Sequence, residues 1–517
     1  MTNKPRLGLI VDSTSVPAWA YRLVERLLVA DAAEVTLLVQ SGFEPAAPTR
    51  LESYLRLERR FLRVVADSFA RSDLRALLPN TPFINANDQQ KIQSRRLDVI
   101  INLSSHDFSR SPLRACARLG LWSWDAHPAS GYIEVLKNLA LTTCELRAFL
   151  PEDDVPKIIR RAVFATDPVS VNRNRNHVFI KTASLLLWAL KRLQLPGGEI
   201  FSDGLEPATE IKSAEPGLIG LATLGLAQAT RYIGRKIRSR LDKEQWIVLT
   251  AQGQRGLTPD WSALKQLDPP RDRYWADPMV VERDGQIYIF VEEFMNNTGR
   301  GRLACLTLNT QGQVITNQTI LERPYHLSYP FIFEHRGKTY MIPETAQNRQ
   351  SELYCCAKFP DQWEFVKPLM TAVYAVDSTL LNHEGRWWLF ANIKAEEGAS
   401  SWDELHLFWA DDPLSTLWTP HPLNPVVSDA SLARPAGPIF QHEGRLYRPS
   451  QDSSRGYGYA VNINRIEVLT ETEYRETLVE KILPQGDLRA IHTFSRAGGW
   501  IVIDAVRPLS KVQVSSL

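Results

Sequence analysis

A repeated hairpin pattern in the second half of the chain limits the folds that it can adopt. Five segments each join an apolar strand to an aromatic-rich strand through a turn, and the turn glycines are Gly285, Gly337, Gly385, Gly444 and Gly498. Glycine suits such turns because it adopts positive φ angles without a steric cost. The spacing of about 50 residues matches one four-stranded blade per repeat, and blades must stack to bury their apolar faces. We therefore predict an all-β five-bladed propeller over residues 245–517.

Polar residues recur at matching positions on either side of these hairpins. Those before the hairpins are Asp277, His326, Tyr329, Asp377, Arg434 and His492, and those after them are Glu292, Glu293, Glu344, Asn392, Gln451, Asp452 and Asp504. Because the inner strand of each blade lines the axis, matching positions converge at one end of it. We therefore predict a polar ring there, made of Asp277, Glu344, Asp377, Arg434 and Asp452.

A ring of this kind suits a saccharide. Sugar hydroxyl groups bond to carboxylates and arginine, while aromatic rings lie against the apolar face of the sugar. The candidate substrate-binding residues are Trp275, Glu293, His326, Tyr329, Arg434, Gln451, Asp452 and His492. The structural alternative is that the acids cap turns or accept bonds from backbone amides. We assign no metal ligands, and His492 is the only side chain that we would consider for an axial cation.

The first half of the chain alternates buried strands with helices. Apolar runs typical of buried strands lie at residues 7–11, 35–39, 97–103 and 120–124. With the helical pattern of residues 15–30, this order predicts an α/β open parallel sheet within residues 1–195. Ligands of such sheets bind at the carboxyl ends of the strands. The residues predicted there are Asn102, Ser104, Ser105, Asp125 and His127.

Composition and missing motifs disfavour several classes of function. No G-x-G-x-x-G follows the first strand and no G-x-x-x-x-G-K-[ST] occurs, so dinucleotide and P-loop nucleotide binding lack their phosphate loops. The net charge of +2 gives no electrostatic reason to expect nucleic acid. The five cysteines lack disulfide or zinc spacing, which indicates a reducing compartment. We expect a cytoplasmic protein without a signal peptide or an integral membrane segment.

Residues 196–244 read as a linker and a helix between the two domains. The helix ends in the basic run RYIGRKIRSR at residues 231–240. The simpler interpretation is a solvated helix, and the alternative is peripheral contact with a membrane surface.

The run from residue 120 to residue 161 resembles the catalytic half of folate-dependent formyltransferases, and the resemblance extends over residues 1–180. His127-Pro128 matches the His-Pro of that family, and Asp153 or Asp154 falls in its acidic turn. Asp125, however, stands where the family has Asn, and an ionised Asp would repel the oxyanion that the amide stabilises. The resemblance implies a formyltransferase-like fold with lost or changed chemistry. The alternative is formyl or acyl transfer to an amino sugar by Asp125, His127 and Asp154, with a folate derivative as cofactor; otherwise the cofactor is unknown.

Several propeller motifs resemble the N-terminal domain of plant glucosamine inositolphosphorylceramide transferases and its bacterial relatives. These motifs are HLSYPFIF, YMIPET, VDSTLL, ARPAG and YRPSQD. Ala276-Asp277-Pro278 and Asp377 also resemble the five-bladed arabinanase and xylosidase type of glycosidase, where the first Asp is the general base and the second tunes the acid. Ala436 stands where those enzymes carry the acid Glu. The resemblance therefore implies Asp277 as the base and Asp377 as the residue that tunes the acid, and Glu344 or Asp452 would have to supply the acid. Our catalytic candidates are Asp277, Asp377 and Glu344.

We accordingly predict a carbohydrate-active protein of glycan or glycolipid biosynthesis. Its propeller would bind a saccharide or a glycan derived from a nucleotide sugar, and paired carboxylates would act on a glycosidic bond. Two alternatives remain, a non-catalytic glycan-binding scaffold and the formyl or acyl transfer by the first domain.

Overall fold

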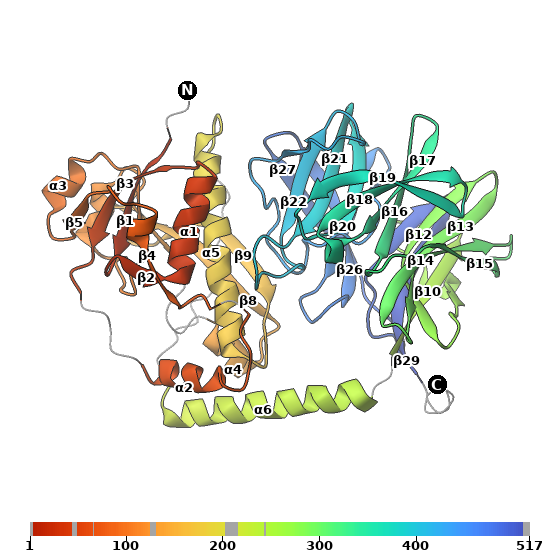
Figure 1. Ribbon diagram of the computed structural model, residues 1–517, viewed down its shortest axis with the longest axis horizontal. Helices are drawn as coiled ribbons and strands as arrows, with labels where there is room; N and C mark the ends of the chain where they lie inside the picture. Colours follow the sequence, from red (N-terminus) through yellow and green to blue (C-terminus); the bar gives the residue numbers. More distant parts are fainter. Residues whose placement is uncertain are drawn as a thin grey trace. The chain divides into compact units, whose positions relative to one another are not determined.

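The computed structural model describes residues 4–43, 49–65, 67–124, 131–201, 216–241 and 244–509. The chain forms two compact units (Figure 1). Unit 1 comprises residues 1–234 with 397–399, and unit 2 comprises residues 235–396 with 400–517.

Unit 1 is built on a seven-stranded sheet with the order β5-β3-β1-β6-β7-β8-β9. Its parallel strands are β5 (Phe83–Asn85), β3 (Glu34–Gln40), β1 (Arg6–Val11), β6 (Val99–Asn102) and β7 (Leu121–Trp124). β8 (Leu141–Phe149) is antiparallel to β7 and to β9 (Lys157–Ala165). The predicted open α/β sheet is confirmed, and the antiparallel β8 makes it a mixed sheet.

Helices and two short strands complete unit 1. They are β2 (Ser15–Pro17), α1 (Ala18–Val29), α2 (Arg50–Glu58), β4 (Arg71–Asp73), α3 (Gln89–Gln93), α4 (Tyr132–Lys137), α5 (Val171–Gln194) and α6 (Leu218–Leu241). Among the described residues, the search for a helix long and apolar enough to cross a membrane finds none.

α2, α5 and α6 meet at the buried carboxylate of Glu58. It accepts hydrogen bonds from the backbone N–H groups of Val171 and Asn172, both at 2.9 Å, and from Nε2 of Gln228 at 2.6 Å. The two backbone donors belong to the first turn of α5, where N–H groups lack helical partners and the helix dipole favours a negative charge. The carboxylate therefore fixes one side of α6 against unit 1.

Unit 2 is a propeller of five four-stranded sheets, as the repeat predicts. Blade one is β12 (Arg273–Arg283), β13 (Gln286–Met295), β14 (Arg300–Leu308) and β15 (Val314–Leu321). Blade two is β16 (Ser328–His335), β17 (Lys338–Glu344), β18 (Gln350–Lys358) and β19 (Gln362–Thr371). Blade three is β20 (Ala375–His383), β21 (Arg386–Ile393), β22 (Leu405–Ala410) and β23 (Thr419–Pro420). Blade four is β24 (Phe440–His442), β25 (Arg445–Asp452), β26 (Ala460–Leu469) and β27 (Tyr474–Ile482).

Blade five combines strands from both ends of the propeller and thereby closes the ring. Its order is β11 (Lys265–Leu267), β10 (Glu244–Gln252), β29 (Trp500–Pro508) and β28 (Phe494–Ala497). β10 pairs with β29 along its whole length, from Glu244 opposite Pro508 to Gln252 opposite Trp500. Val248, Trp275 and Trp500 share one apolar cluster, which packs blade five against blade one.

Four blades have a residue with positive φ at equivalent positions, in the inner strand of blades one to three and just before β24 in blade four. The φ angles are 50° at Asp277, 44° at Tyr329, 53° at Asp377 and 137° at Gly437. At the first three positions the strand pairing shifts register, as at a β-bulge. Side chains rarely adopt positive φ, and such strain collects at functional sites. Bulges also redirect side chains, so these positions mark one end of the axis.

We expect a substitution at Gly437 to disrupt the contact between blades four and five. A Cβ atom there would lie 1.9 Å from the carbonyl oxygen of Phe494, whereas Gly456 has a similar φ of 133° and nothing within 4 Å of its Cβ position. Both Gly→Ala variants pay the cost of positive φ, about 1–3 kcal/mol, but only Gly437→Ala adds the overlap. Denaturant unfolding followed by tryptophan fluorescence should show a clearly larger loss of stability for Gly437→Ala. Equal losses would contradict the close contact.

Candidate functional site

Polar side chains from the starts of the inner strands and the ends of the second strands gather near the propeller axis. We call this group the axial cluster. It consists of Asp277, Glu292, Tyr329, Glu344, Asp377, Arg434, Gln451, His492 and Asp504, all of them buried except Glu344, which is slightly exposed. The cluster lies at the strand ends opposite the glycine turns, and all five blades contribute to it.

A buried histidine between two carboxylates joins blades one and five. Nε2 of His492 lies 3.1 Å from Oδ1 of Asp277, and its Nδ1 lies 2.7 Å from Oδ2 of Asp504. Burial alone would lower the pKa of His492, but the carboxylates of Asp504 and Asp277 outweigh it and raise this pKa to about 10. His492 is therefore an imidazolium at neutral pH.

Asp277 is held as a carboxylate by donors from two neighbouring blades. It accepts hydrogen bonds from Oγ1 of Thr493 at 2.9 Å and from the backbone N–H of Tyr329 at 3.1 Å. Burial opposes ionisation, but the charge of His492 and these hydrogen bonds lower the pKa of Asp277. Its own backbone N–H donates to Asp504 at 3.0 Å.

Asp377 is bound by an arginine and an amide from blade four. Nε and Nη2 of Arg434 lie 2.5 and 3.3 Å from its two oxygens, and Nε2 of Gln451 donates to it at 3.0 Å. Nη2 of Arg434 also lies 3.6 Å from Oε2 of Glu344. One guanidinium thus faces two acids from consecutive blades.

Burial and neighbouring negative charges act in the same direction on the two glutamates of the axial cluster. Burial, followed by the negative charge of Asp377, raises the pKa of Glu344 well above its ordinary value. Burial and the charge of Asp277 do the same to the pKa of Glu292. Oε2 of Glu344 is buried and has no hydrogen-bond partner among the described residues. Protonated acids beside carboxylates are the arrangement that general acid and base chemistry needs.

An aromatic ring that sequence reasoning missed lies over this cluster. Tyr457 is 42% exposed, although its ring centroid is 5.1 Å from the guanidinium of Arg434 and 5.2 Å from the ring of His492. Trp402 lies 5.9 Å from it. Tyr457 belongs to the connection between β25 and β26, outside the repeated hairpins. Its only signal in the sequence is the Gly456-Tyr457-Gly458 triplet, a turn-forming pattern.

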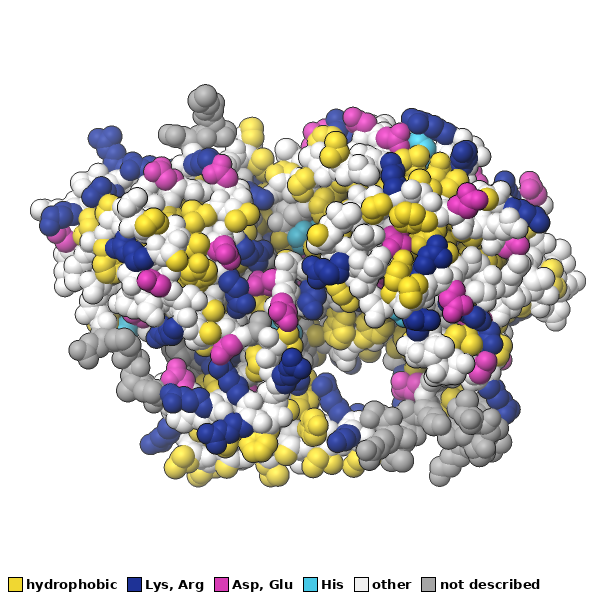
Figure 2. Space-filling view, viewed as in Figure 1, with side chains coloured by type: hydrophobic (Ala, Val, Ile, Leu, Met, Phe, Trp, Pro, Cys, Tyr) yellow, Lys and Arg dark blue, Asp and Glu magenta, His cyan; other side chains and the backbone are white. Residues whose placement is uncertain are grey.

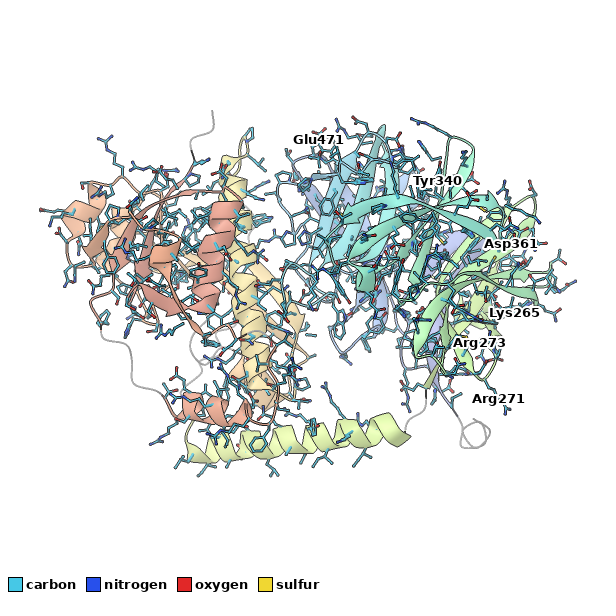
Figure 3. The ribbon with its side chains drawn as sticks, in the orientation of Figure 1. Lys265, Arg271, Arg273, Tyr340, Asp361 and Glu471 are labelled. Atoms are coloured by element: carbon cyan, nitrogen blue, oxygen red, sulfur yellow. The ribbon has the colours of Figure 1, made fainter. Side chains whose placement is uncertain are left out.

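Three predicted substrate-binding residues have other surroundings. Trp275 is packed in the core between blades one and five. Glu293 accepts from Asn317 at 3.1 Å and pairs with Arg302 at 2.7 Å and with Arg273, labelled in Figure 3, at 3.1 Å.

Asp452 likewise departs from the predicted ring, because it pairs with Lys481 of β27 at 2.7 Å and accepts from the N–H of Ser454 at 2.9 Å. Successive strand residues point to opposite faces, so Gln451 and Glu292 reach the axial cluster while their neighbours Asp452 and Glu293 point away.

His326 and Asn392 lie at the edge of the axial cluster. Nδ1 of His326 accepts from the N–H of Gly301 at 3.0 Å, and its Nε2 lies 3.5 Å from Glu292. Burial lowers the pKa of His326, so it is neutral at pH 7. Asn392 takes the position in blade three that Glu344 takes in blade two, and its amide donates to the carbonyl of Ser401 at 3.2 Å.

Asp277, His492 and Asp504 are also the group that could hold a metal ion. Their ligand atoms lie within 4.8 Å of one another. A carboxylate and imidazole set fits a divalent cation. The imidazole must lose a proton to bind it, and the pKa of about 10 shows how strongly the two carboxylates favour that proton. Proton and cation therefore compete for this position.

The residues predicted for unit 1 are only partly described. Asp125 and His127 lie outside the described residues. Asp154 is exposed in the turn between β8 and β9. At the carboxyl ends of β1 and β6, the carboxylate of Asp12 accepts hydrogen bonds from the N–H and the hydroxyl of Ser105, at 3.1 and 2.9 Å.

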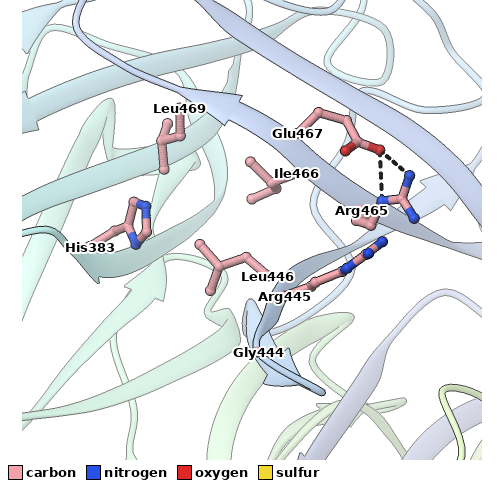
Figure 4. Close-up of a pocket in the computed structure, with 8 residues that line it drawn as sticks. All are labelled: His383, Gly444, Arg445, Leu446, Arg465, Ile466, Glu467 and Leu469. Carbon is pink, nitrogen blue, oxygen red and sulfur yellow. Dashed lines mark hydrogen bonds and ion pairs between the residues drawn. The ribbon is translucent and has the colours of Figure 1, made fainter.

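A separate cavity of about 540 Å³ lies at the hairpin-turn ends of blades three and four (Figure 4). It is lined by His383, Gly444, Arg445, Leu446, Arg465, Ile466, Glu467 and Leu469. Arg465 donates to Glu467 at 2.7 Å, so these two charged residues of the cavity lining neutralise each other. The axial cluster lies at the opposite ends of the strands.

Comparison with known proteins identifies the propeller. Residues 265–490 match the family described as "Glucosamine inositolphosphorylceramide transferase 1, N-terminal". Proteins of that name from Oryza sativa subsp. japonica and Arabidopsis thaliana are 34% identical to the chain over 242 and 209 residues. These alignments cover 44% and 40% of this chain and 32% and 27% of those proteins. The chain thus spans less than a third of the relatives' length.

This match confirms that residues 265–490 resemble that N-terminal domain, and it supports a carbohydrate-related function. Among solved structures, the chain is similar to a thermostable family-43 glycoside hydrolase, with 14% identity, a TM-score of 0.31, and coverage of 41% of this chain and 77% of that one. It is also similar to Zg3597, a family 117 glycoside hydrolase produced by Zobellia galactanivorans, with 11% identity, a TM-score of 0.33, and coverage of 51% and 90%. At these values the likeness says nothing about activity.

We expect His492→Gln to destabilise the propeller in a pH-dependent way. Because the pKa of His492 is raised from 6.5 to about 10, its charge stabilises the fold fully below pH 6.5, and this contribution is lost as the pH rises towards 10. The difference from wild type should be on the order of several kcal/mol at pH 6 and should shrink by pH 10. Urea unfolding at both pH values measures it. The control is His383→Gln at a hairpin turn. A loss of stability in His492→Gln that is the same at both pH values would contradict the ion pairs.

Proposed function

We propose that the propeller binds a saccharide at the axial cluster and that Glu344 acts as a general acid on a glycosidic bond. The observation that carries the proposal is the convergence of Glu344 and Asp377 on Arg434, beneath the exposed ring of Tyr457. Buried donors and acceptors with an aromatic surface are the usual means of binding a sugar.

Each group would have a distinct role in hydrolysis or transfer. Protonated Glu344 gives its proton to the oxygen of the leaving group as the bond to the anomeric carbon breaks. Asp277 accepts the proton of the water or hydroxyl that attacks from the opposite side, so the charges balance. Asp377 and Arg434 position Glu344, and Asp377 keeps its pKa high.

The relatives indicate the class of saccharide. Their name refers to glucosamine and to inositolphosphorylceramide, a lipid that carries a phosphorylated polyol. By analogy we propose a glycan or the headgroup of a glycolipid as the substrate of this chain, made from nucleotide sugars.

A second function is favoured by the bonding of the two aspartates. Asp277 has three donors and a lowered pKa, which makes it a weak base for proton abstraction. The oxygens of Asp377 are bound by Arg434 and Gln451. A propeller with this site could bind a glycan without cleaving it, as a recognition module of glycan biosynthesis.

Glu344→Gln separates the two functions. It keeps the shape and a hydrogen-bond donor but has no proton to give, so turnover of a chromogenic or labelled glycan should fall at least about 100-fold while binding falls only a few-fold. The turnover of wild type should decline as the pH rises through the raised pKa of Glu344. Glu443→Gln, on an exposed hairpin turn, is the matched control. Binding by wild type and Glu344→Gln without turnover by either establishes the recognition module.

Tyr457→Ala tests the aromatic surface. Loss of ring stacking should weaken saccharide binding by about tenfold, whereas Tyr457→Phe should keep most of the affinity because the ring is retained. Calorimetric titration with an oligosaccharide panel measures both. Equal affinity of all three proteins would show that the sugar does not lie against this ring.

A further inference from the structure

α6 has one face that unit 1 covers. Leu221, Leu224 and Gln228 are buried and point towards α2 and α4, where Leu51 and Tyr132 complete the same apolar cluster. The hydrogen bond from Gln228 to Glu58 fixes this orientation.

The opposite face of α6 is an exposed apolar stripe. Ile219, Leu226 and Ile233 recur at intervals of seven residues and Ile237 follows one turn later, so the four side chains share one side of the helix. They are between 51% and 83% exposed. Figure 2 shows hydrophobic side chains along the lower edge of α6, with lysine and arginine beside them. Surfaces of this kind mark contacts with a protein or a membrane.

The charge of α6 identifies the occupant. The sequence of α6 has five cations, Arg231, Arg235, Lys236, Arg238 and Arg240, and residues 218–241 include no acid, whereas the chain as a whole has a net charge of +2. Arg231 donates hydrogen bonds to backbone carbonyls of unit 1, so the exposed cations among the described side chains are Arg235, Lys236 and Arg238. Two such helices would repel each other where their stripes met. An anionic surface would instead attract the basic residues and accept the apolar side chains.

We propose that α6 lies along the surface of an anionic lipid bilayer. The stripe enters the boundary between headgroups and acyl chains, and the basic residues contact the phosphates, as in other interfacial amphipathic helices. Because the net hydrophobicity of α6 is low, the helix lies on the bilayer rather than in it. This surface is separate from the axial cluster and does not depend on the function proposed for it.

Vesicle sedimentation with the full chain tests the proposal. Vesicles of phosphatidylcholine with and without about 30 mol% phosphatidylserine provide the two surfaces. Wild type should sediment with the anionic vesicles, less so at high salt because screening weakens the attraction. Leu226→Asp with Ile233→Asp should lower the partition coefficient about tenfold or more, since the buried apolar area is lost. Lys236→Glu with Arg238→Glu should lower it on anionic vesicles only.

Matched controls keep the test specific. Val29→Asp on α1 and Leu417→Asp in the propeller place the same charge at apolar side chains that are 84% exposed, and both should bind vesicles like wild type. All substituted side chains are exposed, so folding is retained. Failure of wild type to sediment, or equal binding by the stripe variants, overturns the proposal. Concentration-dependent dimerisation that Leu226→Asp abolishes would assign the stripe to a second copy of the chain instead.

Discussion

A single buried carboxylate links the closure of the propeller to its candidate site. Asp277 of blade one accepts a hydrogen bond from the backbone of Tyr329 in blade two and from Thr493 in blade five, and it pairs with His492. Removing partners from a buried charge costs several kcal/mol. The partners of Asp277 therefore hold blades one, two and five together. The side chain that the resemblance to glycosidases implies as a base is therefore also a structural centre of the ring.

The sequence predicts the propeller well because the signals for its strands are local. Alternating apolar residues and turn glycines act over a few residues, and their recurrence fixes the number of blades. The matching positions of polar residues before successive hairpins also led to Asp277, Asp377 and Arg434. The repeat was less reliable in deciding which of two adjacent polar residues faces the axis. A shift of one position moves a side chain to the other face of the strand, as with Glu293 and Asp452. Tyr457 carries no periodic signal because it belongs to a connection.

Protonation is a further property that the sequence does not contain. Glu344 and Asp377 are both acids of the axial cluster and come from consecutive blades. Arg434 and Gln451 bind Asp377 closely, whereas Oε2 of Glu344 has no hydrogen-bond partner among the described residues. Burial then favours the neutral form of the less compensated acid. In unit 1 the parallel strands β1, β3, β6 and β7 were predictable from their apolar runs. The three-residue β5 was missed, and the antiparallel direction of β8 depends on pairing between distant segments.

The pairing of β10 with β29 determines when the propeller can be completed during synthesis. The ribosome makes β10 before the other four blades, but the strand β29, which pairs with β10, emerges only after them. Contacts between segments so far apart in the chain are slow to form, and a strand with a free edge is prone to pair with other chains. Blades one to four can therefore form before β29 is made, whereas blade five stays incomplete until β29 pairs with β10. A chaperone that shields one exposed edge during this interval would be expected to raise the yield of the folded chain.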